Sequence, residues 1–207
     1  AIEHKIPVLE PDKLDEGFFS NLKNYELDLS IVVAYGKIIP ENIINYPKLG
    51  TINIHYSLLP KYRGATPVES AILSGDEETG VSIQQMRFAL DSGPVLVEEK
   101  INIGPSETAL DLRSRLNKIA QKILVGILPN IANKNVEPKE QDKASATFCK
   151  KIKKEDGEIL ENDSDETKWR KYRAYFGWPG IYFFENGKRI KITKARYENE
   201  KFIIEKR

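Results

Sequence analysis

Apolar residues recur at helical spacing in four stretches of the first two thirds of the chain. Steps of three and four residues predict helices over 15–25, 40–46 and 66–73. A longer helix is expected to begin after Ser106, which is a suitable N-cap, and to stop near Pro129. The segments between these helices have a different period.

Those intervening segments have the composition of strands. Apolar and polar side chains alternate over 50–54, 81–86 and 95–103. Residues 31–35 instead form a continuous run, rich in β-branched residues and bounded by Gly36, which is typical of a strand buried on both faces of a parallel sheet. The succession of strands and helices predicts an α/β fold with helices on both faces of one sheet.

The last third of the chain follows another pattern. Residues 135–154 are polar and charged, which predicts a linker between a first domain at 1–134 and a second domain at 155–207. In the second domain, we expect a β-hairpin over 181–192 on an Asn-Gly turn, and a further strand over 202–204.

Composition places the chain among soluble globular proteins, with 30% charged and 40% hydrophobic residues. Its longest apolar runs are interrupted by polar residues, so no membrane span is predicted, and no secretory signal is visible at the start. The single cysteine, Cys149, excludes an intrachain disulfide and favours a cytoplasmic location. Because the two histidines lie far apart in the sequence, no metal site is expected.

The net charge of +1 conceals an asymmetry between the two parts of the chain. Residues 1–138 carry 14 basic and 18 acidic side chains, whereas residues 139–207 carry 18 basic and 13 acidic ones. A basic second part suggests contact with an anionic partner. A lysine-rich surface that is merely solvated would give the same composition.

A carboxamide and an imidazole share one face of the predicted strand at 50–54. Side chains alternate along a strand, so Asn53 and His55 point to one side while Ile52 and Ile54 point to the other. Ligands of open α/β sheets bind at the carboxyl ends of the strands, where this pair lies. Together the two side chains can hold and polarise a carbonyl oxygen. The alternative is a polar strand end with chance hydrogen bonds.

Several motifs around this pair resemble those of the 10-formyltetrahydrofolate-dependent formyltransferase family. The motifs at the centre of the resemblance are Asn53-Ile54-His55, Ser57-Leu58-Leu59-Pro60, Arg63-Gly64 and Leu90-Asp91-Ser92-Gly93. The segments 32–40 and 79–86, followed by Gly177-Trp178-Pro179 and the run from Gly187 to Lys191, extend the likeness over nearly the whole chain. Within the family, the chain most resembles the members that formylate the methionine amine of charged initiator tRNA.

The resemblance implies a partial Rossmann-like sheet followed by a small, incomplete OB-like β-barrel. Members of the family begin with a β-α-β unit, and this chain is expected to start after it and to end before the barrel is complete. The resemblance further implies a catalytic set of Asn53, His55 and Asp91. Asn53 and His55 would stabilise charge on the formyl oxygen, and Asp91 would orient His55 or hold a water. An ordinary surface aspartate in a turn is the alternative for Asp91.

Two groups of binding residues follow from the same resemblance. The donor, 10-formyltetrahydrofolate, is expected to contact Tyr35, Gly36, Lys37, Ile38, Ile39, Ser57, Leu58, Leu59, Pro60, Phe88, Ala89 and Leu90. Contacts with tRNA are expected from Lys61, Arg63, Lys150, Lys151, Lys153 and Lys154, all of which could instead be solvated. Ser57 is not expected to be a nucleophile, because no second histidine follows it closely and Ser-Leu-Leu-Pro is typical of a turn.

Three functions stay open at this point. The first is formyl transfer to charged initiator tRNA by a protein that is monomeric when complete and needs no metal. The second is formylation of a sugar amine, since such enzymes share the Asn, His and Asp set. The third is an inactive fragment that only binds tRNA.

Overall fold

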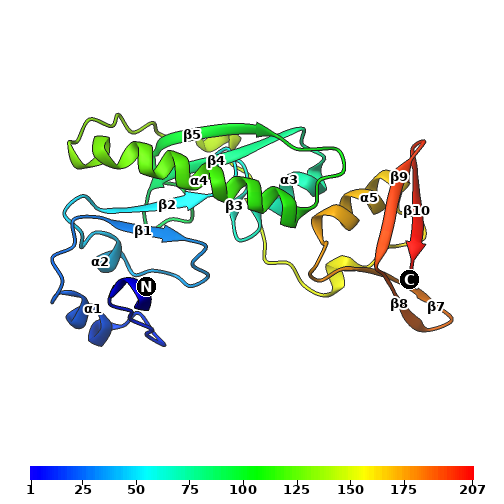
Figure 1. Ribbon diagram of the computed structural model, residues 1–207, viewed down its shortest axis with the longest axis horizontal. Coiled ribbons are helices and arrows are strands. Elements are labelled where there is room, and N and C mark those ends of the chain that lie inside the picture. The colour runs from blue at the N-terminus through cyan, green and yellow to red at the C-terminus, as the bar shows by residue number, and fades with distance from the viewer.

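The computed structural model describes residues 1–207, apart from the side chain of Ile2. Four strands form one sheet in the order β1 (Ser30–Val33), β2 (Thr51–His55), β4 (Glu78–Gln85) and β5 (Val95–Asn102), as Figure 1 shows. The β1–β2 pair is parallel, while β2–β4 and β4–β5 are antiparallel. The α/β prediction is confirmed, with a mixed rather than a parallel sheet.

The main core lies between one face of this sheet and two helices, α3 (Pro67–Ser74) and α4 (Ala109–Ala132). Ile52 and Ile54 of β2 contribute to it from the sheet, and Leu112 and Leu116 of α4 are fully buried against it. Burying a leucine contributes roughly 1.5–3 kcal/mol relative to exposing it, so this face anchors α4.

The ends of α4 differ from the predicted ones. Thr108, not Ser106, is the N-cap, and its hydroxyl accepts from the backbone N–H of Asp111 while the Asp111 carboxylate accepts from the Thr108 backbone. The helix continues through Pro129, because Ile131 is still buried against the core. Among the helices of the described residues, α4 included, none is apolar enough over a sufficient length to cross a membrane.

The opposite face of the sheet meets α2 (Glu41–Ile44), with α1 (Glu16–Leu22) nearby at the β1 side of the molecule (Figure 1). The Thr51 hydroxyl donates to the Ile44 carbonyl at 2.7 Å, and Thr51 lies on the side of β2 opposite to Ile52. The short helix α2 therefore contacts the face of the sheet opposite to α3 and α4. The predicted two-sided burial of 31–35 is wrong, because α3 and α4 pack over the β4 side and leave Ile31 and Val33 42% and 47% exposed.

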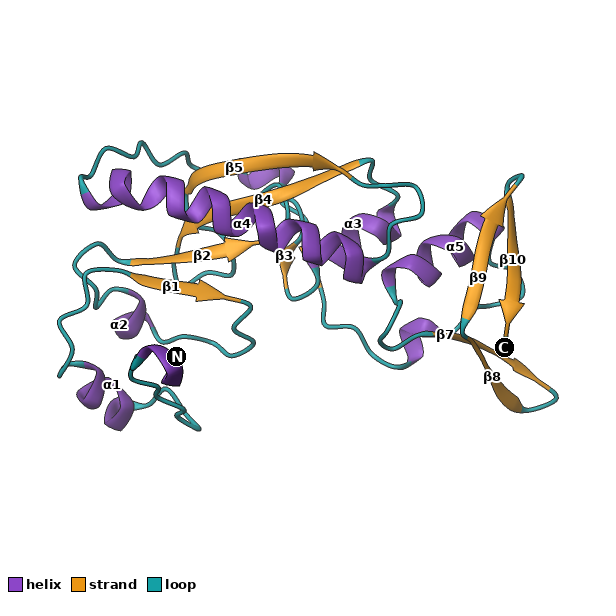
Figure 2. Ribbon diagram, viewed as in Figure 1, coloured by secondary structure: helices purple, strands orange, loops and turns teal.

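The second unit contains α5 (Asp165–Ala174) and four strands (Figure 2). The strands are β7 (Ile181–Glu185), β8 (Lys188–Ile192), β9 (Lys194–Glu198) and β10 (Lys201–Lys206). Asn186 and Gly187 join β7 to β8 with φ angles of 51° and 74°, which confirms the predicted Asn-Gly hairpin. Within the described residues, the four strands form two separate hairpins and no closed barrel.

The predicted linker is partly structured and returns to the first unit. Its strand β6 (Phe148–Cys149) pairs in parallel with β3 (Arg63–Gly64), which follows β2. Three short 3-10 helices complete the secondary structure: η1 (Ile2–His4), η2 (Lys143–Ser145) and η3 (Glu155–Gly157). The linker therefore packs against the loop that leaves the carboxyl end of β2.

Two glycines permit a matched test of how the 86–94 loop packs against the end of β4. A Cβ at Gly93 would lie 1.7 Å from the Gln85 carbonyl oxygen, whereas one at Gly126 in α4 meets nothing within 4 Å. We expect Gly93→Ala to lower the free energy of unfolding by about 1–3 kcal/mol through overpacking. Gly126→Ala should raise it by about 0.5–1 kcal/mol, because alanine favours a helix. Urea unfolding measures both, and equal midpoints for the two variants would contradict the described path of the 86–94 loop.

Candidate active site

Polar side chains from β2 and β4 lie opposite each other on the face of the sheet away from α4. The register pairs Asn53 with Gln84 and His55 with Ser82. Cross-strand partners share a face, so these four side chains form one polar layer. Gln84 and Ser82 are almost completely buried, and His55 is 5% exposed. A loop must therefore cover the layer.

That loop is the 86–94 segment, and it brings Asp91 to the polar layer. One carboxylate oxygen of Asp91, Oδ1, accepts from Asn53 Nδ2 at 3.2 Å and from Gln84 Nε2 at 2.9 Å. The other, Oδ2, accepts from the Gly64 backbone N–H at 2.8 Å. The Asp91 side chain is only 13% exposed. Three donors thus satisfy a carboxylate that has little access to water.

His55 is held from two sides. Its Nε2 lies 2.9 Å from the Tyr62 carbonyl oxygen, and its Nδ1 lies 3.8 Å from Asp91 Oδ2. A carbonyl oxygen only accepts, so Nε2 carries a proton. Nδ1 is left to face the carboxylate, and protonating it would complete an ion pair. The ring is thus oriented for moving a proton at Nδ1.

The residues that hold this cluster have unusual backbone conformations. Tyr62 and Asp91 have φ angles of 57° and 44°, in the left-handed region. Each such conformation costs on the order of 1–3 kcal/mol and persists where the surroundings fix it. Gly64 has a φ of 124°, and a Cβ there would lie 2.3 Å from the Cys149 carbonyl oxygen. Glycine is therefore needed at the position that donates to Asp91.

Hydrogen bonds to Lys61 and to Ser82 of β4 hold the Ser-Leu-Leu-Pro turn in place. Ser57 donates its hydroxyl to the Lys61 carbonyl at 2.6 Å, and Ser82 donates to the Ser57 carbonyl at 2.7 Å. The Leu59 N–H donates to the Ser82 hydroxyl at 3.1 Å. Ser57 and Leu59 are buried, so their side chains face the protein interior. Any folate contact from these two residues would have to come through their backbone.

The other residues predicted to contact folate are mostly exposed. The 35–39 segment follows β1, and since β1 and β2 are parallel it lies at the sheet edge where His55 ends β2. Tyr35 and Ile38 expose large apolar side chains there. Phe88 and Leu90 do so on the loop that carries Asp91. The exposed apolar side chains are consistent with a flat aromatic ligand, and the folate contacts stay a prediction.

The predicted tRNA-binding residues fall into two classes. Lys150, Lys151, Lys153 and Lys154 are exposed in the linker, and Lys61 forms an ion pair with Asp76 while remaining accessible. Arg63 is different: it is 7% exposed, and its guanidinium donates to the Gln141 side chain from Nε at 3.1 Å and from Nη2 at 2.7 Å. This burial argues against the predicted contact between Arg63 and tRNA.

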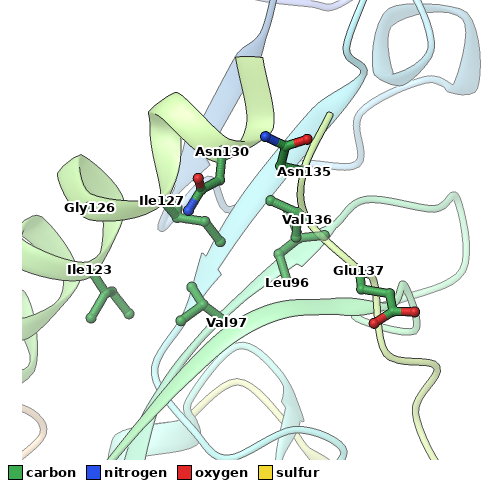
Figure 3. A pocket seen from close by; sticks show the side chains of 9 residues that line it. All are labelled: Leu96, Val97, Ile123, Gly126, Ile127, Asn130, Asn135, Val136 and Glu137. Atoms are coloured by element: carbon green, nitrogen blue, oxygen red, sulfur yellow. The ribbon is translucent and has the colours of Figure 1, made fainter. Parts of the chain in front are cut away.

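Two cavities of about 440 Å³ lie near the sheet and the linker. The one in Figure 3 lies on the α4 side, where aliphatic side chains such as Ile123, Ile127 and Val97 form its wall and Glu137 lies at its edge. The other adjoins the loop after β3 and includes Lys151 and Trp178. In the described part of the chain, no group of three or more His, Cys, Asp or Glu side chains is placed to hold a metal ion.

Three residues of the cluster were missed by sequence reasoning. Gln84 could have been found, because strand alternation over 81–86 places it on one face with Ser82. Tyr62 acts through its carbonyl, which no side-chain pattern reveals. Gln141 lies in the predicted linker and donates to the carbonyls of Asp91 and Gly93 at 2.9 and 2.6 Å. Its separation in sequence from both concealed that contact.

Comparison with known proteins identifies the family. Residues 3–128 match the family described as formyl transferase, and residues 151–205 match the one described as formyl transferase, C-terminal domain. The chain belongs to the formyl transferase family, which confirms the resemblance seen in its motifs.

Within this family, the chain is similar to curated methionyl-tRNA formyltransferases. The chain is 41% identical over 204 residues to a methionyl-tRNA formyltransferase of Dictyoglomus turgidum, covering 98% of this chain and 65% of the relative. It is 38% identical over 194 residues to a methionyl-tRNA formyltransferase of Thermus thermophilus, covering 93% and 63%. The chain thus spans somewhat less than two thirds of the length of these relatives.

Solved structures support the fold. HypX from Aquifex aeolicus in complex with tetrahydrofolic acid matches with a TM-score of 0.73 and 21% identity, over 87% of this chain and 31% of that one. A sugar N-formyltransferase from a Shewanella species matches with a TM-score of 0.73 and 19% identity, over 86% and 73%. At these identities the likeness extends to the architecture alone.

Cys149 of β6 pairs with Gly64 of β3 and offers a chemical probe of the packing around it. Burial raises the pKa of its thiol, although its Sγ accepts from the Thr66 N–H at 3.3 Å. A raised pKa leaves less thiolate at a given pH, so we expect iodoacetamide to react slowly at pH 7.5 and faster as the pH rises. The urea-unfolded chain is the matched control, because it contains the same single cysteine. Equal rates in the folded and unfolded chains would contradict the partial burial of Cys149.

Proposed function

We propose that this protein transfers a formyl group from 10-formyltetrahydrofolate to the methionine amine of charged initiator tRNA. The observation that carries the proposal is the cluster of Asn53, His55 and Asp91, joined at the polar face of β2. The 41% identity to a methionyl-tRNA formyltransferase supports the same acceptor.

The chemistry needs stabilisation of an oxyanion and movement of one proton. The amine nitrogen attacks the formyl carbon, the bond from that carbon to N10 of the folate breaks, and the proton lost by the amine returns to N10. Negative charge develops on the formyl oxygen during the attack. Asn53 is the donor for that oxygen, since its amide has a second hydrogen beyond the one given to Asp91.

His55 and Asp91 handle the proton. His55 faces Asp91 with Nδ1, so the pair can take a proton from the amine and pass it on. Positioned acid–base groups of this kind contribute about 10²–10⁴-fold to a rate. The low exposure of both side chains keeps water from competing with the amine.

The linker favours tRNA over a sugar as the acceptor. Four lysines between 150 and 154 are exposed and close in sequence. Lys151 also borders the cavity that includes Ala65 and Thr66, the two residues that follow Gly64 in the loop after β3. Such a surface suits a polyanion, whose phosphates attract several lysines at once.

Substitution of the catalytic pair tests the chemistry. Asn53→Ala and His55→Ala should each lower kcat by about 100-fold or more while KM for 10-formyltetrahydrofolate changes little. The reason is that both side chains interact more strongly with the transition state than with the bound donor. Steady-state transfer of labelled formyl to charged initiator tRNA, at varied donor concentration, measures both constants. An increase in KM for the donor as large as the decrease in kcat would make these residues donor-binding groups instead.

Donor binding is tested independently of turnover. A ligand that binds only the folded state stabilises it by about 2.7 kcal/mol at 100 times its Kd, so a folate analogue should raise the melting temperature. A melting shift without formyl transfer to any acceptor would favour a fragment that binds but does not react. Transfer to an amino-sugar nucleotide in preference to tRNA would favour the sugar-amine alternative.

Charge removal in the linker tests the acceptor. Replacing Lys150, Lys151, Lys153 and Lys154 by alanine should weaken tRNA binding and flatten its dependence on salt. Each lysine that contacts a phosphate contributes about −0.7 to −0.9 to the slope of log K against log salt concentration. Filter binding of charged initiator tRNA over a salt series measures the slope.

A charge-matched variant provides the control. Lys13, Lys118, Lys122 and Lys134 are exposed outside the 150–154 cluster, and their replacement by alanine removes the same net charge. This variant should keep most of the salt slope of the parent. If both quadruple variants lose the same slope, binding reflects net charge alone and the linker has no specific role.

A further inference from the structure

Gln141 contacts the cluster from outside the sheet. It belongs to the segment between the two matched family regions, which end at 128 and resume at 151. Its Nε2 donates to the carbonyl oxygens of Asp91 at 2.9 Å and Gly93 at 2.6 Å, with Gln84 Oε1 at 3.4 Å. Its Oε1 accepts from two nitrogens of Arg63. One side chain thus joins three separate segments.

The orientation of this amide is determined by its surroundings. The groups facing Nε2 are oxygens, which can only accept, and the group facing Oε1 is a guanidinium, which can only donate. Turning the amide over would therefore break every one of these bonds. Arg63 is buried, so a lost partner leaves a charged group unsatisfied.

Asp91 depends on such support because it lies in no helix or strand. Its backbone is in the left-handed region at a φ of 44°. Gln84 fixes the turn from the sheet, donating to Asp91 Oδ1 at 2.9 Å and accepting from the Gly93 N–H at 3.1 Å. Gln141 fixes it from the opposite side through the backbone carbonyls.

Arg63 connects Gln141 to the strand that carries Gly64. It precedes Gly64, whose N–H donates to Asp91 Oδ2, and its own side chain holds Gln141. The pairing of β3 with β6 fixes the same strand from the linker. Any shift of Gln141 is therefore transmitted to Asp91 by two routes, through the turn and through β3.

We propose that Gln141 is a positioning residue for Asp91, so that the segment connecting the two family regions sets the geometry of the formyl-transfer site. This inference rests on the proposed function for its kinetic consequence but not for its structural one. Gln141 itself contacts no reacting atom. Its effect on the reaction passes through the turn at Asp91.

The test uses the 207-residue chain with two substitutions at this position. Gln141→Glu keeps the length and the contact with Arg63 but cannot donate to the two carbonyls, and Gln141→Ala removes both contacts. Glu140→Gln is the control, because Glu140 is adjacent and pairs with Arg87 at the surface. The first readout is the amide proton resonance of Gly64, which reports the bond to the Asp91 carboxylate without requiring activity.

We expect the Gly64 resonance to move upfield in both Gln141 variants and to stay in place in Glu140→Gln. In the formyl-transfer assay, kcat should fall about 10- to 100-fold with KM for the donor within about twofold, as for a catalytic group displaced by about 1 Å. If Gln141→Ala does not fold, Gln141→Glu alone decides the outcome.

The outcomes separate this inference from the proposed function. An unchanged Gly64 resonance in Gln141→Glu would overturn the positioning role, whether or not kcat falls. A shifted resonance with undiminished kcat would overturn the link to the reaction. If the parent chain transfers no formyl group while the resonance moves as expected, the positioning role stands and the proposed function fails.

Discussion

The hydrogen bonds accepted by the carboxylate of Asp91, a side chain only 13% exposed, are the interaction on which the rest of the site depends. The carboxylate accepts from Asn53, Gln84 and the Gly64 backbone, so it ties together β2, β4 and β3. Its low exposure matters, because electrostatic interactions strengthen where water is excluded. The same burial makes each donor necessary, since an unsatisfied carboxylate in this place would be strongly unfavourable. The stability of the fold and the proposed chemistry therefore both require the three donors around Asp91.

The register of the sheet links this cluster to the hydrophobic core. Ile52 and Ile54 of β2 are buried against α3 and α4, and alternation sends Asn53 and His55 to the other face. A slip of one residue would exchange the two faces, burying polar groups in the core and exposing isoleucines at the site. The core that stabilises the fold therefore also selects the orientation of Asn53 and His55. Similarly, Gly64 and Gly93 permit the close approaches that place donors around Asp91.

Much of the fold and part of the site were predictable from sequence, for identifiable physical reasons. Regular periodicity located the strands and the long helix, and the Asn-Gly turn located the β7–β8 hairpin. The capping residue of the long helix was harder to predict, because Ser106 and Thr108 are both good N-caps. Only Thr108 has the reciprocal partner, Asp111. The burial of β1 depended on whether helices reach it, which its own residues do not encode.

The site was only partly visible for a related reason. Alternation placed Asn53 and His55 together, and the family motif added Asp91, whose approach depends on the 86–94 loop. The family resemblance implied that Arg63 contacts tRNA, whereas its burial against Gln141 depends on a contact across 78 residues. Gln141 was hidden for the same reason. Long-range hydrogen bonds leave no periodic trace in a sequence.

The most direct measurement is the rate of formyl transfer by Asp91→Asn in a single turnover. Asparagine has nearly the same shape, but its amide nitrogen cannot accept a hydrogen bond, so one of the two acceptor positions is lost. We expect this variant to unfold cooperatively like its parent and to transfer formyl to charged initiator tRNA at least about 100-fold more slowly. An Asp91→Asn variant that transfers formyl as fast as its parent would contradict the account.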